Sequence, residues 1–251
     1  MSDKPHILLT GARRGIGKAA ADALTDKARL VRHASSPGEG VDAAADFAEP
    51  GSAQSLWQQA LELLDGRIDV LVNNAGIFEA SDIEQDDAAW RADFERTLQV
   101  NLTASAELCR LAVRHFREHR GGATPQSNTL GGPRGGRIVN IASRAAYRGD
   151  SPHHWHYAAS KGGMVAMTKT IARGYAGEGI LAFAICPGFV MTGMAEDYLE
   201  SRGGPELLKD IPLGRVASPE EIAETIRFCA LDAPPSMTGA VLDVNGASFV
   251  R

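Results

Sequence analysis

The sequence predicts an α/β fold in which a single, doubly wound, parallel sheet carries helices on both faces. Short aliphatic runs alternate with longer helical stretches along the whole chain. The short runs are apolar at nearly every position, as in strands buried on both faces of a parallel sheet. No linker or internal repeat interrupts the 251 residues. With right-handed crossovers, these observations predict one domain that spans residues 1–251.

The predicted elements follow this alternation in order. In the first half, we expect strands at 6–10, around Leu30 and Val31, in a weak alanine-rich run that ends at Asp46, and at 68–72, with helices at 15–27, 52–64 and 88–117. In the second half, we expect strands at 137–141, 181–185 and 240–244, with helices at 157–175 and 219–231.

Two stretches depart from this regular pattern. Residues 34–45 contain Pro37, Gly38 and Gly40 and leave little room for a crossover helix between the second and third strands. Residues 118–136 contain six glycines and two prolines, which predicts a flexible surface loop without a role in chemistry.

The composition excludes several classes of partner and compartment. A formal net charge of -5 gives no reason to expect nucleic acid or an anionic membrane as partner. No apolar run is long enough to span a membrane, and the first residues lack the pattern of a signal peptide. The three cysteines, an odd number without a C-x-x-C pair, indicate reduced thiols and a cytoplasmic protein.

A glycine-rich turn follows the first predicted strand and opens the first predicted helix. Gly11, Gly15 and Gly17 allow a tight turn and a close approach of the backbone to a pyrophosphate, and the helix N-terminus offers free N–H groups. The same turn contains Arg13 and Arg14. A loop of this kind at the start of a strand–helix–strand unit predicts a Rossmann-type fold that binds a dinucleotide.

The spacing of these glycines, G-x-x-x-G-x-G, resembles the cofactor loop of the short-chain dehydrogenases/reductases. The resemblance extends in the family's order over nearly the whole chain, through Asp46, the run Asn73-Asn74-Ala75-Gly76, Asn101, Ser143, the run from Tyr157 to Lys161, Pro187-Gly188 and Thr192. It implies an oxidoreductase that transfers hydride between a nicotinamide cofactor and a secondary alcohol or ketone. The predicted cofactor-binding residues are Gly11, Arg13, Arg14, Gly15, Ile16, Gly17, Ser35, Asp46, Phe47, Asn74, Ala75, Gly76, Tyr157, Lys161, Pro187, Gly188, Val190 and Thr192.

Two of these residues have structural alternatives. The resemblance implies that Asp46 holds the adenine amino group, but an acid at this place can also cap the helix that follows Pro50. Asn73 is either part of the cofactor pocket or purely a hydrogen-bonding residue at the strand end.

The predicted catalytic residues are Asn101, Ser143, Tyr157 and Lys161. Tyr157 and Lys161 are four residues apart in a helix and therefore share one face. We expect the Lys161 ammonium to favour the phenolate of Tyr157, which then acts as the acid/base; a pKa about 3 units lower needs on the order of 4 kcal/mol. Ser143 is expected to hydrogen-bond the substrate oxygen. By resemblance, Asn101 holds a water that links the lysine to solvent, and an asparagine inside a long helix is consistent with a local distortion.

The preferred cofactor is predicted to be NADP, with NAD as the alternative. Sites selective for NAD usually place an acid about 20 residues beyond the glycine loop, where it bonds the ribose hydroxyl. Here the second strand ends in Ser35 and Ser36, and no acid occurs before Glu39. Arg13 and Arg14 suit a phosphate.

The substrate side of the site is less defined by the sequence. Residues 191–210 are expected to form an amphipathic substrate lid with a hinge at Gly203-Gly204. His153, His154 and His156 precede Tyr157 and are expected to line the substrate pocket, and we predict no metal site.

Likeness to 3-oxoacyl-carrier-protein reductases extends to residues 211–215 and 242–246, which makes that subgroup the first expectation for the substrate. Sugar or polyol dehydrogenases stay open, and the direction of the reaction is not predicted. A non-catalytic dinucleotide-binding sensor is the alternative from another class, although such proteins can lose Ser143, Tyr157 and Lys161, which are all present here. A nucleotide-sugar epimerase on a related fold is a third alternative. Those chains are longer and carry an extra substrate domain, for which this chain has no room. The resemblance also implies a homo-oligomer, usually a tetramer.

Overall fold

The structure, a computed structural model, describes residues 4–119, 135–191 and 208–251. Within these residues, parallel strands form a single sheet in the order β3-β2-β1-β4-β5-β6-β7. This confirms the predicted doubly wound α/β class. The strands are β1 (His6–Leu9), β2 (Arg29–Ala34), β3 (Ala43–Ala44), β4 (Val70–Asn73), β5 (Arg137–Ile141), β6 (Leu181–Pro187) and β7 (Val241–Val244).

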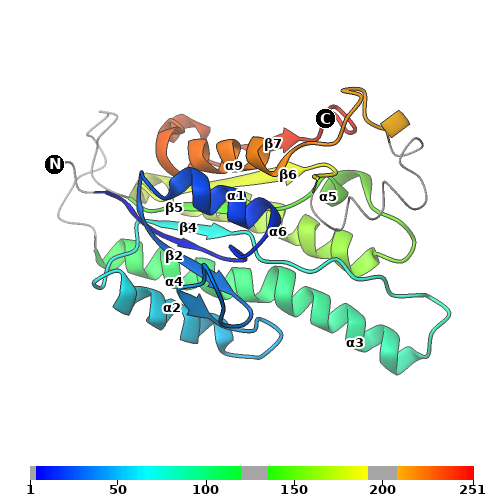
Figure 1. The fold of residues 1–251 in the computed structure, drawn as a ribbon, viewed down its shortest axis with the longest axis horizontal. Coiled ribbons are helices and arrows are strands. Elements are labelled where there is room, and N and C mark those ends of the chain that lie inside the picture. The colour runs from blue at the N-terminus through cyan, green and yellow to red at the C-terminus, as the bar shows by residue number, and fades with distance from the viewer. Residues whose placement is uncertain (1–3, 120–134, 192–207) are drawn as a thin grey trace.

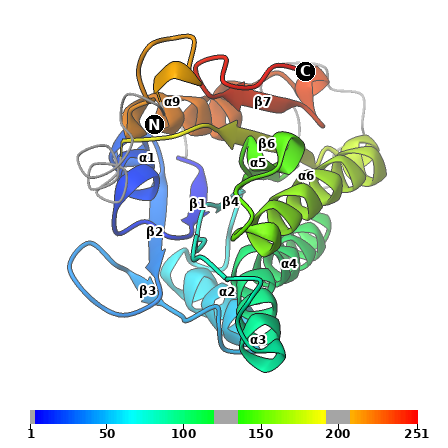
Figure 2. The same cartoon turned by 90° about the vertical axis from the view of Figure 1, so that its right-hand side faces the viewer.

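Helices cover both faces of this sheet. Figures 1 and 2 show α1 and α9 on one face and α2, α4 and α6 on the other. The main helices are α1 (Gly15–Leu24), α2 (Ser52–Leu63), α3 (Asp87–Leu98), α4 (Ala104–Glu118), α5 (Ala145–Arg148), α6 (Trp155–Tyr175) and α9 (Pro219–Arg227). All were predicted except the short α5, which has no periodic pattern of its own. Within the described ranges, no helix combines the length and the apolar character needed to cross a membrane.

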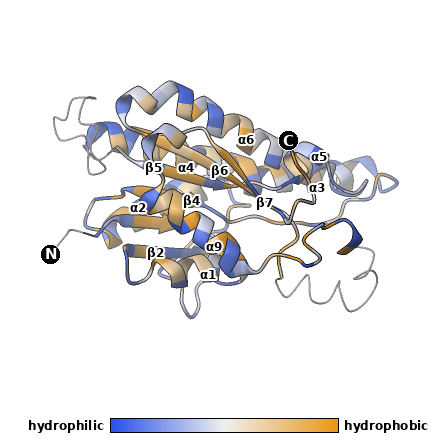
Figure 3. Cartoon of the chain, turned by 90° about the horizontal axis from the view of Figure 1, so that it is seen from above, coloured by the Kyte–Doolittle hydropathy of each residue, from blue (hydrophilic) through white to orange (hydrophobic). Residues whose placement is uncertain are grey.

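Each face of the sheet has its own hydrophobic core, because successive strand residues point to opposite sides. In β1, for example, Leu8 packs into the cluster under α2 and α4, whereas Ile7 and Leu9 pack into the cluster under α1 and α9. Figure 3 shows the central strands as almost continuously hydrophobic. This explains why the strands lack a polar–apolar alternation in the sequence.

The predicted irregular stretches have different outcomes. The connection from β2 to β3 contains no helix, as its length and its proline and glycines predict. The expected flexible loop at 118–136 and the expected lid at 191–210 lie mostly outside the described residues, and both stay predictions. The single-domain organisation also stays a prediction.

The long helical region predicted at 88–117 is broken by one turn of π-helix at Gln99–Thr103, between α3 and α4. Asn101 lies in this turn and is completely buried. The local distortion predicted at Asn101 is therefore confirmed.

Candidate active site

The carboxyl ends of the strands bring most of the predicted site residues to one edge of the sheet. The loops after β1, β4, β5 and β6 all emerge at this edge, on the right of Figure 1, where the first turns of α5 and α6 also lie. Ligands of open α/β sheets bind at this edge. Segments far apart in the sequence thus form one candidate site.

The glycine loop packs tightly against the loop after β4. Gly11 has a φ of 67°, a conformation that favours glycine, and a Cβ on Gly17 would lie 1.9 Å from the carbonyl oxygen of Gly11. The side-chain nitrogen of Asn74 donates to the carbonyl oxygens of Thr10 and Gly11, at 3.0 Å each. The Thr10 hydroxyl accepts the backbone N–H groups of Asn74 and Ala75. The glycines are therefore required by packing as well as by any ligand.

Asn73 is placed differently from its neighbours in the same run. Its side chain is buried, donates to the Asn140 side chain at 2.8 Å and contacts the Cys109 sulfur. It faces the sheet interior, which favours the strand-end alternative. Gly76, by contrast, faces the candidate centre: a Cβ there would lie 3.2 Å from Asn101 Oδ1 and 3.5 Å from Lys161 Nζ.

His33 joins the glycine loop to the segment after β3, a role that was not predicted. Its Nδ1 accepts the Gly11 N–H at 3.3 Å, so its Nε2 carries the proton and donates to the Ala45 carbonyl at 2.9 Å. Its ring stacks on the buried Phe47 side chain. The signal in the sequence is weak: a histidine next to the last residue of a strand that also contains Arg29 and Arg32.

The predicted adenine-binding residues lie next to His33. The exposed Asp46 accepts the N–H of Ala48 and does not cap α2, whose N-cap is Gly51. Because the Phe47 side chain is buried against His33, only its backbone is placed to meet a cofactor. Ile16, at the start of α1, packs partly into the core beneath α1 and α9.

Arg13 lies over the end of β2. Its guanidinium donates to the Ser36 hydroxyl at 3.1 Å, to the Ser36 carbonyl, and to the Pro37 carbonyl at 3.0 Å. Arg14 and Ser35 are exposed nearby, and Gly15 opens α1 with a φ of 53°.

Within the described residues, no acid near this end of β2 forms an ion pair with Arg13. Asp42 is held by the side chain and the backbone N–H of Arg32. In the described part of the chain, Glu39 forms no ion pair or side-chain hydrogen bond. The end of β2 therefore presents a guanidinium and hydroxyl groups, and no described carboxylate is bonded to that guanidinium.

Tyr157 and Lys161 share a face of α6, as predicted, with Lys161 Nζ 5.7 Å from the centre of the Tyr157 ring. The Ser143 hydroxyl accepts the N–H of Ala145 and also hydrogen-bonds the Tyr157 side chain. Lys161 is buried and donates to the Ile141 carbonyl at 2.9 Å. Three of the four predicted catalytic side chains thus meet at the end of β5.

The electrostatics of this group differ from the expectation. Burial raises the pKa of Tyr157 to about 12, and the hydrogen bond from Ser143 opposes this only in part. Burial lowers the pKa of Lys161 to about 8. The prediction that Lys161 lowers the pKa of Tyr157 is wrong for the protein alone, because the amine is directed to the Ile141 carbonyl and burial dominates both groups.

Asn101 reaches the same centre from the π-helical turn. Its side chain accepts the N–H of Ile77 at 2.8 Å and donates to the Ile77 carbonyl at 2.9 Å, and it also contacts the Ser160 hydroxyl. It therefore fixes the chain just after Gly76, close to Lys161.

The turn after β6 closes the site on the side of β7. A Cβ on Gly188, which follows Pro187, would lie 2.9 Å from Asn245. Val190 pairs with Ala217 in an isolated bridge. Thr192 and most of the expected lid lie outside the described residues.

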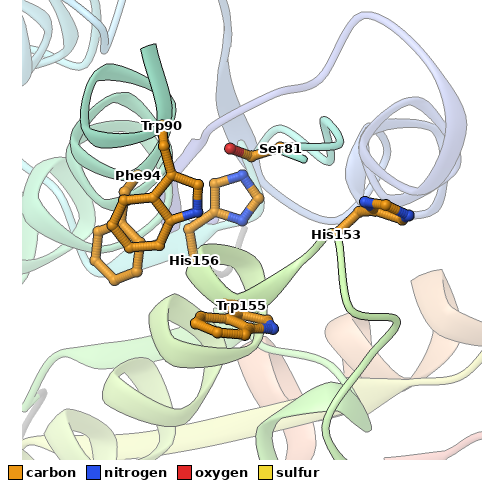
Figure 4. A pocket seen from close by; sticks show the side chains of 6 residues that line it. All are labelled: Ser81, Trp90, Phe94, His153, Trp155 and His156. Atoms are coloured by element: carbon orange, nitrogen blue, oxygen red, sulfur yellow. The ribbon is translucent and has the colours of Figure 1, made fainter. Parts of the chain in front are cut away.

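The three histidines before Tyr157 do not form one wall. His154 stacks on Phe78 with ring centres 3.9 Å apart, and Phe78 in turn meets the edge of the Tyr157 ring at 4.7 Å. His156 is buried between α3 and α6, where it lines a cavity of about 10 Å³ with Trp90 and other residues (Figure 4). His153 is exposed. Of the three histidines, His154 is the one joined to Tyr157 by ring contacts, through the unpredicted Phe78.

The described residues hold no cluster of three or more potential metal ligands. They do fit a dinucleotide. The glycine cradle of Gly11 and Gly17 leads to the N-terminus of α1, and Gly76 leaves open the space beside Lys161.

Comparisons with known proteins agree with this geometry. A family model described as enoyl-(acyl carrier protein) reductase matches residues 11–247. A 3-oxoacyl-(acyl-carrier-protein) reductase of Synechocystis sp. is 35% identical over 95% of this chain and 94% of its own length. D-threitol dehydrogenase of Mycolicibacterium smegmatis is 32% identical over 99% of this chain and 94% of its own length.

Among solved structures, the ligand-free aldohexose dehydrogenase of Thermoplasma acidophilum has the same fold. It superimposes with a TM-score of 0.80 at 24% identity and covers 99% of this chain and 95% of its own. Together, the family model, the relatives and the fold show that the chain belongs to the short-chain dehydrogenases/reductases, oxidoreductases that transfer hydride with a nicotinamide cofactor.

Proposed function

We propose that this enzyme reduces a ketone, or oxidises the corresponding secondary alcohol, with NADP as its preferred cofactor. The observation that carries the cofactor preference is the position of Arg13 over the Ser36–Pro37 backbone at the end of β2. A 2′-phosphate there would meet a guanidinium and serine hydroxyls, while Asp42 is already neutralised by Arg32. NAD would lose the carboxylate that usually bonds its ribose.

Tyr157 is the proposed acid/base, with Ser143 and Lys161 as its partners. Bound NADPH supplies the hydride. Ser143 and Tyr157 are then placed to hydrogen-bond the substrate oxygen, and Tyr157 transfers the proton to it. Lys161, now bonded to the Ile141 carbonyl, is the proposed ligand of the nicotinamide ribose. This assembled group favours an enzyme over a non-catalytic dinucleotide sensor.

The first candidate for the substrate is a 3-oxoacyl group, as the printed names of several relatives suggest. A sugar or polyol is the second candidate, supported by the D-threitol dehydrogenase relative.

We also propose a homo-oligomer, with the tetramer as the expected state. The three cysteines are buried and unpaired, which supports a reducing compartment such as the cytoplasm.

The cofactor preference is tested by kcat/KM for NADPH and for NADH on one ketone. We expect the wild type to prefer NADPH. Arg13→Ala should lower kcat/KM for NADPH by about 10- to 100-fold, since a hydrogen bond to a charged group contributes about 1.5–3 kcal/mol. The kcat/KM for NADH should change little. Arg14→Ala should show a smaller loss in the same direction. Arg29→Ala is the matched control, because Arg29 lies at the opposite end of β2 and pairs with Asp65. Equal or higher efficiency with NADH in the wild type would overturn the preference.

A further inference from the structure

Arg144 is a buried arginine that forms no ion pair with any described residue. Its side chain is only 9% exposed, and one guanidinium nitrogen, NH1, is buried without a hydrogen-bond partner. Within the described residues, no carboxylate forms an ion pair with it. Arg137 shows the usual arrangement for comparison: its guanidinium donates to the carbonyls of Cys229 and Ala233 at 3.0 Å each. Arg144 therefore differs from an arginine that has only a structural role.

An uncompensated guanidinium is unfavourable in a protein interior. Arginine keeps its charge at any physiological pH, and buried charges are normally paired and fully hydrogen-bonded. The ring of Phe189 covers the face of the guanidinium at 4.5 Å, a cation–π contact. That contact leaves the buried NH1 group without an acceptor.

The position of Arg144 connects it to the candidate active centre. It directly follows Ser143, and its backbone N–H donates to the Pro187 carbonyl at 3.0 Å, so it lies between the Ser143 loop and the turn after β6. Burial lowers the pKa of Arg144, and the nearby Asp150 and Asp210 carboxylates oppose this only in part; Asp150 also lies within electrostatic reach of Tyr157.

The charges around Arg144 limit what it can bind. The neighbouring Arg148 is paired with Asp210 at 3.5 Å, and Asp150 adds a negative charge nearby. The two guanidinium groups and the two carboxylates balance, so no excess positive charge is present to hold a dianionic phosphate, and a single carboxylate bonded to the free NH1 is the anion that fits. The planar fork of a guanidinium matches a carboxylate.

We propose that Arg144 binds a carboxylate of the substrate, so that the enzyme acts on oxo acids or hydroxy acids. This rests on the proposed hydride transfer and narrows its substrate class to free acids rather than thioesters. Arg144 would orient the substrate while Ser143 and Tyr157 contact the reacting oxygen.

The first test compares binding of acids with that of their methyl esters. The probes are short 2-oxo and 3-oxo acids, each beside its ester, added to the NADP complex while Tm is measured. We expect an acid to raise the Tm of the wild type more than its ester does, and Arg144→Met to abolish the difference. Arg148→Met, which removes a nearby exposed charge, should keep it. If no acid stabilises the wild type more than its ester, or if Arg144→Met keeps the difference, the proposal is wrong.

The Tm without ligand separates binding from structural support. Arg144→Met should match or exceed the Tm of the wild type, because it removes a buried charge that has an unsatisfied N–H group and no ion pair, and it retains a side chain to pack on Phe189. Arg137→Met should lower the Tm, since it removes a paired guanidinium. A Tm loss in Arg144→Met as large as in Arg137→Met would show a structural role and contradict the proposal.

Turnover with NADPH distinguishes failure of this inference from failure of the proposed function. The ratio of kcat/KM for acid and ester is taken within each variant, so a general loss of activity cancels. We expect a ratio of about tenfold or more in the wild type and about 1 in Arg144→Met. Reduction of both partners without preference for the acid overturns the carboxylate site only. If neither partner of any pair oxidises NADPH, the proposed function itself fails.

Discussion

At the level of single residues, the surroundings of the half-buried Tyr157 and the buried Lys161 favour the neutral forms of both side chains. The pKa of Tyr157 is raised to about 12 and that of Lys161 is lowered to about 8. A phenolate therefore needs additional positive charge, and the oxidised nicotinamide carries such a charge when it is bound. The account thus places proton transfer at Tyr157 under the control of cofactor binding.

Tyr157→Phe tests the acid/base role. The hydroxyl is lost while the ring that meets Phe78 is kept, so cofactor affinity should stay and kcat should fall by at least about 100-fold. Steady-state turnover and a cofactor titration measure the two effects. Tyr175→Phe, at the end of the same helix, is the control and should turn over normally. Near-wild-type turnover in Tyr157→Phe would remove this residue from the mechanism.

Lys161 is expected to have two roles, which its pKa makes testable. Because the pKa lies at about 8, the amine loses its charge as the pH rises past that value, and its bond to the cofactor ribose should weaken there. Cofactor Kd measured across this range should rise with pH in the wild type. Lys161→Met should weaken binding, flatten this profile and lower kcat, whereas Lys169→Met on the same helix should not. A change in only one of binding and kcat would disprove the double role.

At the level of elements, the sequence predicted what depends on local pattern. Continuous aliphatic runs predicted the buried strands, and the glycine-rich loop predicted the start of α1. Asn101 marked the break in the long helix, because asparagine is unfavourable there. The pairing of His33 with Gly11 and Ala45, the stacking of Phe78 on His154, and the burial of Arg144 join segments distant in the sequence. Such contacts depend on tertiary packing and have no local pattern.

Two glycine substitutions test the packing of the cofactor loop. Gly17→Ala forces a Cβ to within 1.9 Å of the Gly11 carbonyl oxygen, so the loop must shift. We expect weaker cofactor binding and a loss of about 1–3 kcal/mol in the free energy of unfolding. Gly174→Ala is the matched control: nothing lies within 4 Å of its Cβ position in α6, and alanine should stabilise the helix by up to about 1 kcal/mol. Unchanged cofactor binding in Gly17→Ala would refute the tight cradle.

At the level of the whole molecule, the sheet order places β1, β4, β5 and β6 side by side at its centre, so their carboxyl-end loops converge. Two buried histidines, His33 in β2 and His115 in α4, are held in their neutral form. His33 accepts the N–H of Gly11 and His115 accepts the N–H of Ile68, and burial lowers the pKa of each from 6.5 to about 4. The global stability should therefore depend on pH.

The sign of this dependence follows from proton binding. Between pH 6.5 and about pH 4 the unfolded chain protonates His33 while the folded protein does not, so stability is lost as the pH falls. For His33 the free energy of unfolding falls by about 3 kcal/mol over this range, and His115 adds a loss in the same direction. Urea unfolding at a series of pH values in this range measures the free energy of unfolding. His33→Gln should be less stable at neutral pH but should lose less on acidification; an equal loss in both proteins would contradict the neutral imidazole.

Direct hydride transfer from the cofactor is the central claim, and isotopic labelling tests it most directly. NADPH deuterated at both C4 positions is incubated with the enzyme and a ketone from the oxo-acid panel, and the alcohol is examined by NMR and mass spectrometry. The account predicts deuterium on the carbinol carbon, with the hydroxyl proton taken from solvent through Tyr157. An alcohol whose carbinol hydrogen comes from solvent would contradict direct transfer.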